Sequence, residues 1–283
     1  MTATAAASVR TGILDCVQVN LAVLADRQHG PEHHLALGAR LRFRPRPGPD
    51  GLPTVDPAPE EHLRDGAALL GLRPDALAHR VPPDGLRALA RRTSVVYAVA
   101  DSYDMPWLPY AGRAHMEHSF LVGAHRDGAE VEDAYDNETA WGPARPGRWT
   151  FPWERLPTAS FACGLTPEPE YRAPRPELCL DDPAPYVEAY TAHPDRLAAL
   201  RRLTAETWLL TRARHLHAAY REHLGERLDA RDHLRRWDRL TATAFIAQRR
   251  AERGRPVPGD LLPELASLLT ADHEVFAVAP HRP

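Results

Sequence analysis

The pattern of apolar and polar residues changes once along the chain. Up to about residue 165, short apolar runs alternate with Gly and Pro turns, which is typical of mixed helix and strand structure. From about residue 186 the chain is rich in Ala, Leu, Arg and Glu, with apolar residues three and four positions apart, which indicates amphipathic helices. The sequence therefore predicts an α+β domain over residues 1–165 and an all-α domain over residues 186–283.

Prolines separate the two halves. Residues 166–185 contain six prolines, and proline blocks the continuation of a helix and favours extended backbone. We therefore expect this segment to be a linker. In the helical half that follows, the apolar spacing predicts helices over residues 195–224, 229–250 and 259–269.

The first half contains patterns of both helices and strands. Helical spacing predicts helices over residues 16–29, 60–70 and 83–90, and β-branched residues predict a strand over residues 94–101. The runs HSFLVGAH and GAEVEDAY flank a turn whose Asp-Gly pair, at 127 and 128, favours the positive φ angles of a β-hairpin. WTFPWERL predicts an edge strand, because Pro152 is unfavourable in a central one, and SFACGL follows it. Together these elements predict a small antiparallel sheet.

Composition and charge exclude some classes of function. The 283 residues include 35 basic and 38 acidic side chains, for a net charge of -3, and 43% are hydrophobic. Such a chain can bury a sizeable core but has no overall basic field to attract nucleic acid. No apolar run approaches the roughly 20 residues of a membrane span and no secretory signal is present, so we expect a cytoplasmic protein that binds neither nucleic acid nor membranes. Every basic residue is Arg, which excludes Schiff-base chemistry by lysine.

The three cysteines, Cys16, Cys163 and Cys179, are widely spaced and include no CxxC pair. Neither a disulfide framework nor a zinc ribbon is indicated. Asp15 and Gln18 form a potential capping box, which would place Cys16 at the first residue of a helix. The N–H groups and the dipole of a helix N-terminus stabilise a thiolate, and one of those N–H groups can help to bind an oxyanion. Cys163 and Cys179 lack such a position, and we expect them to be structural.

Nucleophilic cysteine chemistry requires a base that takes the thiol proton and a third group that orients the base. His118 opens the first strand of the predicted hairpin and Asp133 closes the second, so the turn brings them close together. Cys16, His118 and Asp133 are therefore the predicted catalytic residues, with Asn137 as an alternative orienting residue. Each also has a structural interpretation: a small buried side chain for Cys16, a core or edge histidine for His118, and a solvated turn for Asp133.

A metal site is a weaker alternative near the same hairpin. Imidazole and carboxylate suit zinc or iron, and four candidates lie close together in sequence, namely His115, Glu117, His118 and His125. Their spacing matches no metal motif, and His118 and His125 would face opposite sides of a regular strand. We therefore expect no metal. We also expect no other bound cofactor, because the dinucleotide-binding, P-loop and nucleophile-elbow motifs are absent.

Two further segments have both a functional and a structural interpretation. The loop before His118 is rich in aromatic residues and proline, as the wall of a substrate pocket can be, and its candidate binding residues are Tyr103, Asp104, Trp107 and Tyr110. It could equally be a loop fixed by its own apolar side chains. In the helical half, residues 212–240 mix Arg, His and acidic residues, which indicates a solvated helix face or a docking surface for an acidic carrier protein.

A longer combination of motifs resembles one protein family. An Asp-Cys pair precedes an apolar helix near the N-terminus, VVYAVADSYDMPWLPY follows, and HMEHSFLVGAHRDGAEVEDAY comes next. This order resembles the butirosin-biosynthesis acyltransferase family, whose N-terminal domain is related to papain-like cysteine peptidases. The resemblance covers about residues 12–165, and the helical domain after them is similar in arrangement. It implies a papain-like fold for the N-terminal domain.

The resemblance also implies a reaction. By position, Cys16 would be the nucleophile, His118 the base and Asp133 the orienting residue of a Cys-His-Asp triad. The family implies transfer of an acyl group from a carrier-protein thioester, presented on a phosphopantetheine arm, to an amine in specialised-metabolite biosynthesis. Two positions depart from the family pattern: Asp15 precedes Cys16 where members often have His, and no Gln precedes Cys16 to complete a papain-style oxyanion hole.

We therefore predict a cysteine-dependent acyltransferase whose partners are an acyl or peptidyl carrier protein and a small-molecule amine acceptor. Two alternatives stay open. A cysteine peptidase, amidase or thioester hydrolase on the same fold would release the acyl product to water. A non-catalytic scaffold would keep the fold and bind a carrier protein through the helical domain. An apolar helix face in the second half is also compatible with a homodimer.

Overall fold

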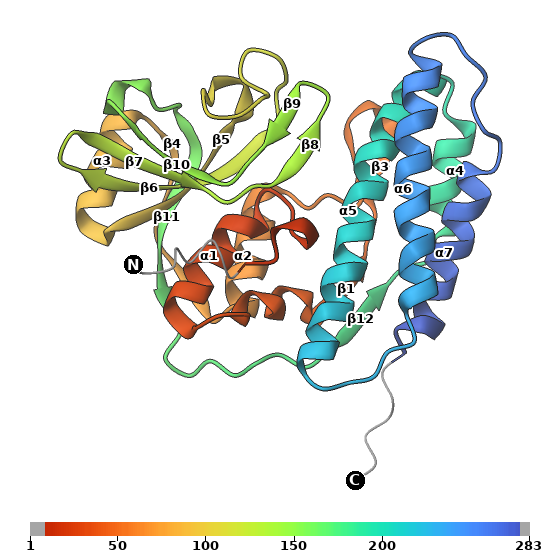
Figure 1. Cartoon of the computed structure of the whole chain (residues 1–283), viewed down its shortest axis with the longest axis horizontal. Helices are drawn as coiled ribbons and strands as arrows, with labels where there is room; N and C mark the ends of the chain where they lie inside the picture. The colour runs from red at the N-terminus through yellow and green to blue at the C-terminus, as the bar shows by residue number, and fades with distance from the viewer. Residues whose placement is uncertain (1–8, 278–283) are drawn as a thin grey trace. The chain divides into compact units, whose positions relative to one another are not determined.

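The chain divides into two units whose limits differ from those of the predicted domains (Figure 1). The computed structural model describes residues 9–277. The first unit consists of residues up to Leu37 together with Ala58–Pro174, and the second consists of Gly38–Pro57 together with the chain from Arg175 onward. Residues 38–57 therefore belong to the helical unit, and the predicted linker, residues 166–185, is shared between the two units.

A strand pairing explains this division. β1 (Arg40–Phe43) pairs in parallel with β12 (Glu177–Leu180), so the segment 38–57 is hydrogen-bonded to part of the predicted linker. β12 is only four residues long and none of its side chains is fully buried. Such a short run among prolines has no clear strand pattern in the sequence.

The first unit contains a six-stranded antiparallel sheet, in agreement with the predicted α+β class. The strand order is β10-β7-β6-β5-β11-β4 (Figure 1). The strands are β4 (Leu72–Val81), β5 (Val95–Asp101), β6 (Glu117–His125), β7 (Gly128–Asp133), β10 (Gly147–Phe151) and β11 (Ala159–Pro167). β10 is an edge strand as predicted, and Pro152 lies just beyond it. The sequence pattern does not predict β4, because Pro74 and Asp75 interrupt its apolar residues.

The predicted β6–β7 hairpin is present with a two-residue turn, since His125 pairs with Gly128. Gly128 has a φ of 146°, whereas Asp127 is not among the residues with positive φ, so the glycine alone supplies this conformation. A Cβ atom at Gly128 would lie 2.3 Å from the Phe151 carbonyl oxygen. The close approach of β10 therefore requires glycine here. A smaller hairpin of β8 (Asn137–Thr139) and β9 (Gly142–Ala144) follows β7.

Three helices accompany the sheet at the predicted places: α1 (Gln18–His29), α2 (Pro59–Leu69) and α3 (Pro83–Thr93). α1 is buried over most of its surface, and Val19, Leu21 and Val23 are inaccessible to solvent. Its buried side chains include the polar Asn20 and Asp26, which therefore need hydrogen-bond partners inside the unit. α1 packs against α2 and β6, which brings its N-terminus to the sheet.

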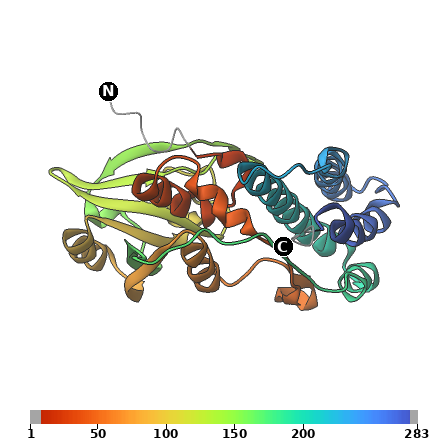
Figure 2. The same cartoon turned by 90° about the horizontal axis from the view of Figure 1, so that it is seen from below.

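Helices form most of the second unit: α4 (Ala184–Ala192), α5 (Arg196–His223), α6 (Arg231–Ala251) and α7 (Leu261–Val275). α6 packs against α5 and α7, and α4 packs against α7 (Figure 2). α5, α6 and α7 correspond to the predicted helices. α4 is absent from the prediction because its prolines resemble a linker, although proline is compatible with a first helical turn. The β1–β12 pair and the pairing of β2 (Arg46–Pro47) with β3 (Pro53–Thr54) show that the unit is not all-α.

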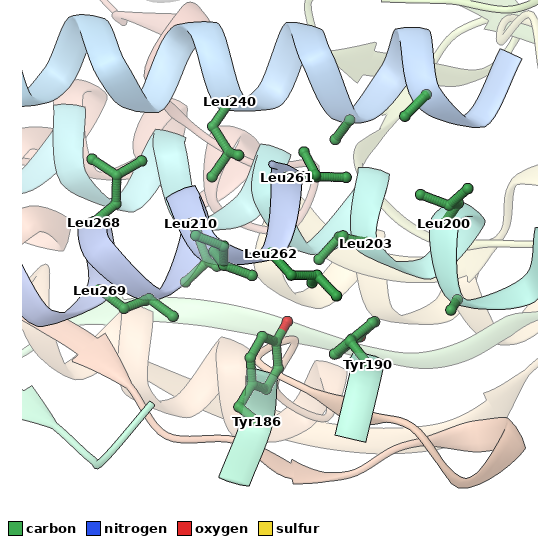
Figure 3. Packing of buried hydrophobic residues seen from close by; sticks show 14 of the residues in the cluster. Tyr186, Tyr190, Leu200, Leu203, Leu210, Leu240, Leu261, Leu262, Leu268 and Leu269 are labelled. Atoms are coloured by element: carbon green, nitrogen blue, oxygen red, sulfur yellow. The ribbon is translucent and has the colours of Figure 1, made fainter. Parts of the chain in front are cut away.

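The core of the second unit consists of leucines and tyrosines from these helices (Figure 3). Tyr186 and Tyr190 project from α4 toward leucines of α5 and α7, such as Leu203 and Leu262. Arg214 and Asp272 form an ion pair inside the unit with no exposed side-chain surface, and the closest atoms, Nη2 and Oδ2, are 2.5 Å apart. Removal of one partner from a buried ion pair costs about 3 to 5 kcal/mol. Within residues 9–277, no helix combines the length and the apolar character needed to cross a membrane.

His217 on α5 is fully buried and uses only one of its ring nitrogens. Nδ1 lies 2.7 Å from the Gly38 carbonyl oxygen, so the neutral ring carries its proton on Nδ1, while Nε2 has no hydrogen-bond partner. Burial lowers the pKa of His217 to about 4, although the bond to Gly38 acts in the opposite direction. The backbone at Gly38 lies close to α5, since a Cβ atom at Gly38 would be 2.3 Å from the Leu216 carbonyl oxygen.

The lowered pKa of His217 predicts a loss of stability in acid. As pH falls below 6.5, the unfolded chain protonates this side chain, whereas the folded chain keeps it neutral until about pH 4. The unfolded state therefore binds more protons in this window, and the free energy of unfolding decreases as pH falls. From pH 7 to pH 4, wild type should lose about 3 kcal/mol more than His217→Gln in urea denaturation. Parallel pH profiles for the two proteins would contradict this assignment.

Candidate active site

The N-terminus of α1 carries the capping box that the sequence predicts. Asp15 Oδ1 accepts hydrogen bonds from the Val17 N–H at 2.8 Å and the Gln18 N–H at 2.9 Å. The Asp15 N–H in turn donates to Gln18 Oε1 at 3.3 Å. The regular helix begins at Gln18, so Cys16 lies in the capping turn rather than in the helix. Because Asp15 engages the Val17 and Gln18 N–H groups, these two are not directed at an oxyanion.

The Asp15 carboxylate, next to the candidate nucleophile, has polar partners inside the unit. Its Oδ2 lies 3.3 Å from Nε2 of His62 on α2, and both side chains are largely buried. The carboxylate therefore has two N–H donors on one oxygen and an imidazole beside the other.

Cys16 lies against the first residues of β6. Its Sγ donates to the Glu117 carbonyl oxygen at 3.6 Å, and its own carbonyl oxygen accepts a hydrogen bond from Ser119 Oγ at 2.5 Å. Cys16 thus contacts the residues on both sides of His118. The packing of the capping turn on β6 brings the predicted nucleophile to the strand that carries the predicted base.

His118 and Asp133 form a buried hydrogen-bonded pair. Leu121 pairs with Glu132 in the hairpin register, so Asp133 lies diagonally across from His118 on the same face of the sheet. His118 Nε2 is 2.7 Å from Asp133 Oδ2, and the two side chains are 0% and 2% exposed. The hairpin therefore pairs His118 with Asp133 and not with Asn137, which begins β8.

The Asp133 carboxylate is surrounded by donors. Oδ1 accepts from the Tyr135 N–H at 3.0 Å and from Asn20 Nδ2 at 3.2 Å, and Oδ2 accepts from Trp107 Nε1 at 3.1 Å in addition to His118. Burial favours the neutral acid, but the charge of His118 and the hydrogen bonds from His118, Tyr135 and Asn20 hold the pKa of Asp133 below its ordinary value. Asp133 is therefore ionised at neutral pH.

An ionised Asp133 determines which nitrogen of His118 carries a proton. The carboxylate can only accept, so Nε2 of His118 must donate to it. In the neutral ring, Nδ1 then carries a lone pair. This Nδ1 is buried and has no hydrogen-bond partner. A buried lone pair without a donor is what a general base requires. Nε2 of His217 is also without a partner, so what distinguishes His118 is that Cys16 contacts the residues on both sides of it.

Trp107, one of the predicted substrate-binding residues, is bonded to the buried pair. Its indole donates to Asp133, and its ring packs against Phe120 and Trp149 with centroid distances of 5.3 and 6.3 Å. In the sequence, Trp107 stands out by its place in an aromatic loop just before β6. The pattern of this loop does not indicate that Asp133 is its partner.

The other predicted substrate residues of this loop do not share one environment. Tyr103 is 39% exposed and stacks on His115 with the ring centroids 4.3 Å apart. Asp104 is exposed, whereas Tyr110 is buried and meets the edge of Trp141. Tyr103 and Asp104 thus line an open surface, and Tyr110 helps to fix the loop.

The histidines of the metal alternative have separate carboxylate partners. His115 pairs with Asp101 at 2.6 Å and His125 with Asp127 at 3.7 Å, while His118 is bonded to Asp133. In the described part of the chain, no group of three or more His, Cys, Asp or Glu side chains is arranged to hold a metal ion.

The Arg-rich segment 212–240 of the helical unit is largely paired within its own unit. Arg236 contacts Glu264 at 3.0 Å, and Arg221 contacts Glu226 at 2.6 Å. These ion pairs favour the interpretation of this segment as an ordinary helix face. They give no support of their own to a carrier-protein docking surface.

Cys163 and Cys179 lack the surroundings of Cys16. Cys163 is fully buried on β11, and burial, assisted by Asp75, raises the pKa of its thiol to about 12. Burial and the neighbouring Glu177 also raise the pKa of Cys179. Neither thiol ionises readily at neutral pH.

Comparison with protein-family models gives no match for this chain, and a search of the curated proteins gives none either. The assignment of a function therefore depends on the contacts of Cys16, His118 and Asp133.

The surroundings of the cysteines predict selective alkylation. At pH 8, iodoacetamide should modify Cys16 in the folded protein and leave Cys163 unmodified, because the Cys163 thiol is buried and its pKa is about 12. Peptide mass mapping of the alkylated protein measures both sites, and denatured protein, in which both should react, is the control. Equal labelling of the two cysteines in the folded chain would contradict the assignment.

Proposed function

We propose that this protein is an acyltransferase in which Cys16 is the nucleophile, His118 the general base and Asp133 the residue that orients His118. The observation that carries the proposal is the state of His118, whose Nε2 is held by a buried carboxylate while its buried Nδ1 has no partner. Cys16 contacts the residues on both sides of this histidine, and a thiol there can transfer its proton to Nδ1.

The order of elements supports a papain-like fold for the first unit. A cysteine in the capping turn of a helix packs on a strand that opens with His118, and Asp133 closes the next strand. This is the order that the resemblance to the butirosin-biosynthesis acyltransferases implies. The proposal therefore includes the donor and acceptor of that family: an acyl group on the phosphopantetheine arm of a carrier protein, and an amine.

The first half-reaction loads the enzyme. His118 Nδ1 takes the proton of Cys16 Sγ, and Asp133 stabilises the resulting imidazolium. The thiolate adds to the thioester carbonyl carbon, and the tetrahedral intermediate collapses with breakage of the bond to the donor sulfur. His118 returns its proton to this leaving thiol, and the acyl group stays on Cys16. The oxyanion must be stabilised by donors other than the Val17 and Gln18 N–H groups, which bind Asp15.

The second half-reaction transfers the acyl group. The amine adds to the carbonyl carbon of the acyl-cysteine and gives a proton to His118 Nδ1. Collapse of this second intermediate forms the amide and releases the sulfur of Cys16, which recovers the proton from His118. Water in place of the amine would give hydrolysis by the same steps.

Intact-protein mass spectrometry with an acyl N-acetylcysteamine thioester tests the loading step. Wild type should gain one acyl group, whereas Cys16→Ala should gain none and His118→Ala should be loaded at least about 100-fold more slowly. Cys179→Ala is the matched control, because Cys179 is also partly exposed but burial and Glu177 raise the pKa of its thiol, and this variant should load like wild type.

The fate of the acyl-enzyme then separates the alternatives. Release of the acyl group on addition of amines, with amide formation, supports transfer, and equally fast release in water alone favours a hydrolase or peptidase. Absence of loading in wild type with several acyl chains would contradict the proposal and favour a non-catalytic scaffold.

A further inference from the structure

A single carboxamide joins the helix that follows Cys16 to both strands of the His–Asp hairpin. Asn20 lies on the first turn of α1 and is fully buried. The two hydrogens of its Nδ2 are shared among three acceptors: the Ser119 carbonyl oxygen at 2.9 Å, Ser119 Oγ at 3.0 Å and Asp133 Oδ1 at 3.2 Å. Its Oδ1 accepts from the Ala134 N–H at 3.0 Å. The Asn20 side chain is thus hydrogen-bonded to Ser119 on β6, next to His118, and to Asp133 at the end of β7.

These bonds determine how the Asp133 carboxylate is turned. Asn20 and the Tyr135 N–H occupy Oδ1, which leaves Oδ2 for His118 and Trp107. Without a donor from α1, Oδ1 would lose one of its two hydrogen bonds in a site that excludes water. The carboxylate would then be less well fixed and would bind a proton more readily, because Asn20 helps to hold the pKa of Asp133 down.

The same side chain is linked to the nucleophile. Ser119 Oγ, which accepts from Asn20, donates to the Cys16 carbonyl oxygen at 2.5 Å. A chain of hydrogen bonds therefore runs from the backbone of Cys16 through Ser119 and Asn20 to Asp133.

We infer that Asn20 is a positioning residue for the reaction: it holds the Asp133 carboxylate toward His118 and fixes this pair against the turn that carries Cys16. This inference rests on the proposed function of Cys16, His118 and Asp133. Asn20 acts through Asp133 and does not contact the acyl group.

Asparagine fits this position better than residues of similar shape. Leucine would leave the Ala134 N–H and the Ser119 carbonyl oxygen without their partner on α1, a cost to stability as well as to orientation. Aspartate would keep an acceptor for the Ala134 N–H but would place a second carboxylate about 3.2 Å from Asp133. Two carboxylates at that distance retain a proton to higher pH.

These differences allow a structural role to be separated from a positioning role. The measurement is the rate of Cys16 alkylation by iodoacetamide as a function of pH, in wild type, Asn20→Leu, Asn20→Asp and His118→Ala. The acidic limb of this profile is the pH range in which the alkylation rate falls as the pH is lowered. Loss of the Asn20 donor should move this limb to higher pH by about one unit in Asn20→Leu. The shift should be larger in Asn20→Asp, although this variant keeps an acceptor for the Ala134 N–H.

Asp26→Asn is the matched control. Asp26 is also buried on α1, where it accepts from the His34 N–H at 2.8 Å and contacts the His34 ring, at the other end of the helix from Cys16. This variant should be less stable than wild type in urea while keeping the wild-type acidic limb. If Asn20→Leu does not fold, the comparison of Asn20→Asp with Asp26→Asn decides the outcome.

Two results would overturn the inference in different ways. If both Asn20 variants lose stability but keep the wild-type acidic limb, Asn20 is only structural, and the proposed function is unaffected. If wild type and His118→Ala show the same alkylation profile, Cys16 is not coupled to His118, and both the inference and the proposed function fail.

Discussion

A carboxylate removed from water is stable as an anion only when hydrogen-bond donors replace the water that it loses, and Asp133 imposes this requirement on the first unit. Its 2% exposed side chain receives donors from a helix, an aromatic loop, a strand and its own turn, namely from Asn20, Trp107, His118 and the Tyr135 N–H. The elements that supply these donors must therefore pack together before the charge can be buried. The state of His118 follows from the same requirement, because the anion forces Nε2 to donate and leaves Nδ1 as a base.

The second constraint is the attachment of α1 to the sheet. The Tyr97 hydroxyl on β5 donates to the Val17 carbonyl oxygen at 2.9 Å, next to the candidate nucleophile. At the other end of the helix, Arg27 forms an ion pair with the buried Glu132 on β7. The helix is thus bonded to the sheet at both ends, and Asn20 is bonded to it between them. The turn that carries Cys16 is therefore held against the sheet at the end of an anchored helix.

Much of the candidate site could be predicted because its signals are local. The capping box needs only the spacing of Asp15 and Gln18, and the hairpin needs only two alternating runs and a glycine. The contacts that join these elements are not local. Asn20 and Asp133 are 113 residues apart along the chain, and a buried asparagine in an apolar helix does not indicate its partner.

The parts of the fold that the sequence does not predict have a similar cause. β1 and β12 are strands of four residues that pair with each other across the chain. The alternation in β1 is too short to predict a strand, and β12 lies among prolines. The prolines around α4 resemble a linker, although they are compatible with a helix start. The role of Trp107 was not visible because an aromatic side chain in a loop can bind a ligand or cover a buried charge, and only the packing distinguishes these.

Nitrogen-15 NMR of the His118 ring tests the central claim most directly, with His118→Gln used to assign the signals. If Nε2 donates to Asp133, the neutral ring should carry its proton on Nε2, and Nδ1 should show the chemical shift of an unprotonated nitrogen. The same tautomer is expected in Cys16→Ala, because Asp133 and not Cys16 determines it. A neutral ring that carries its proton on Nδ1 would contradict the account.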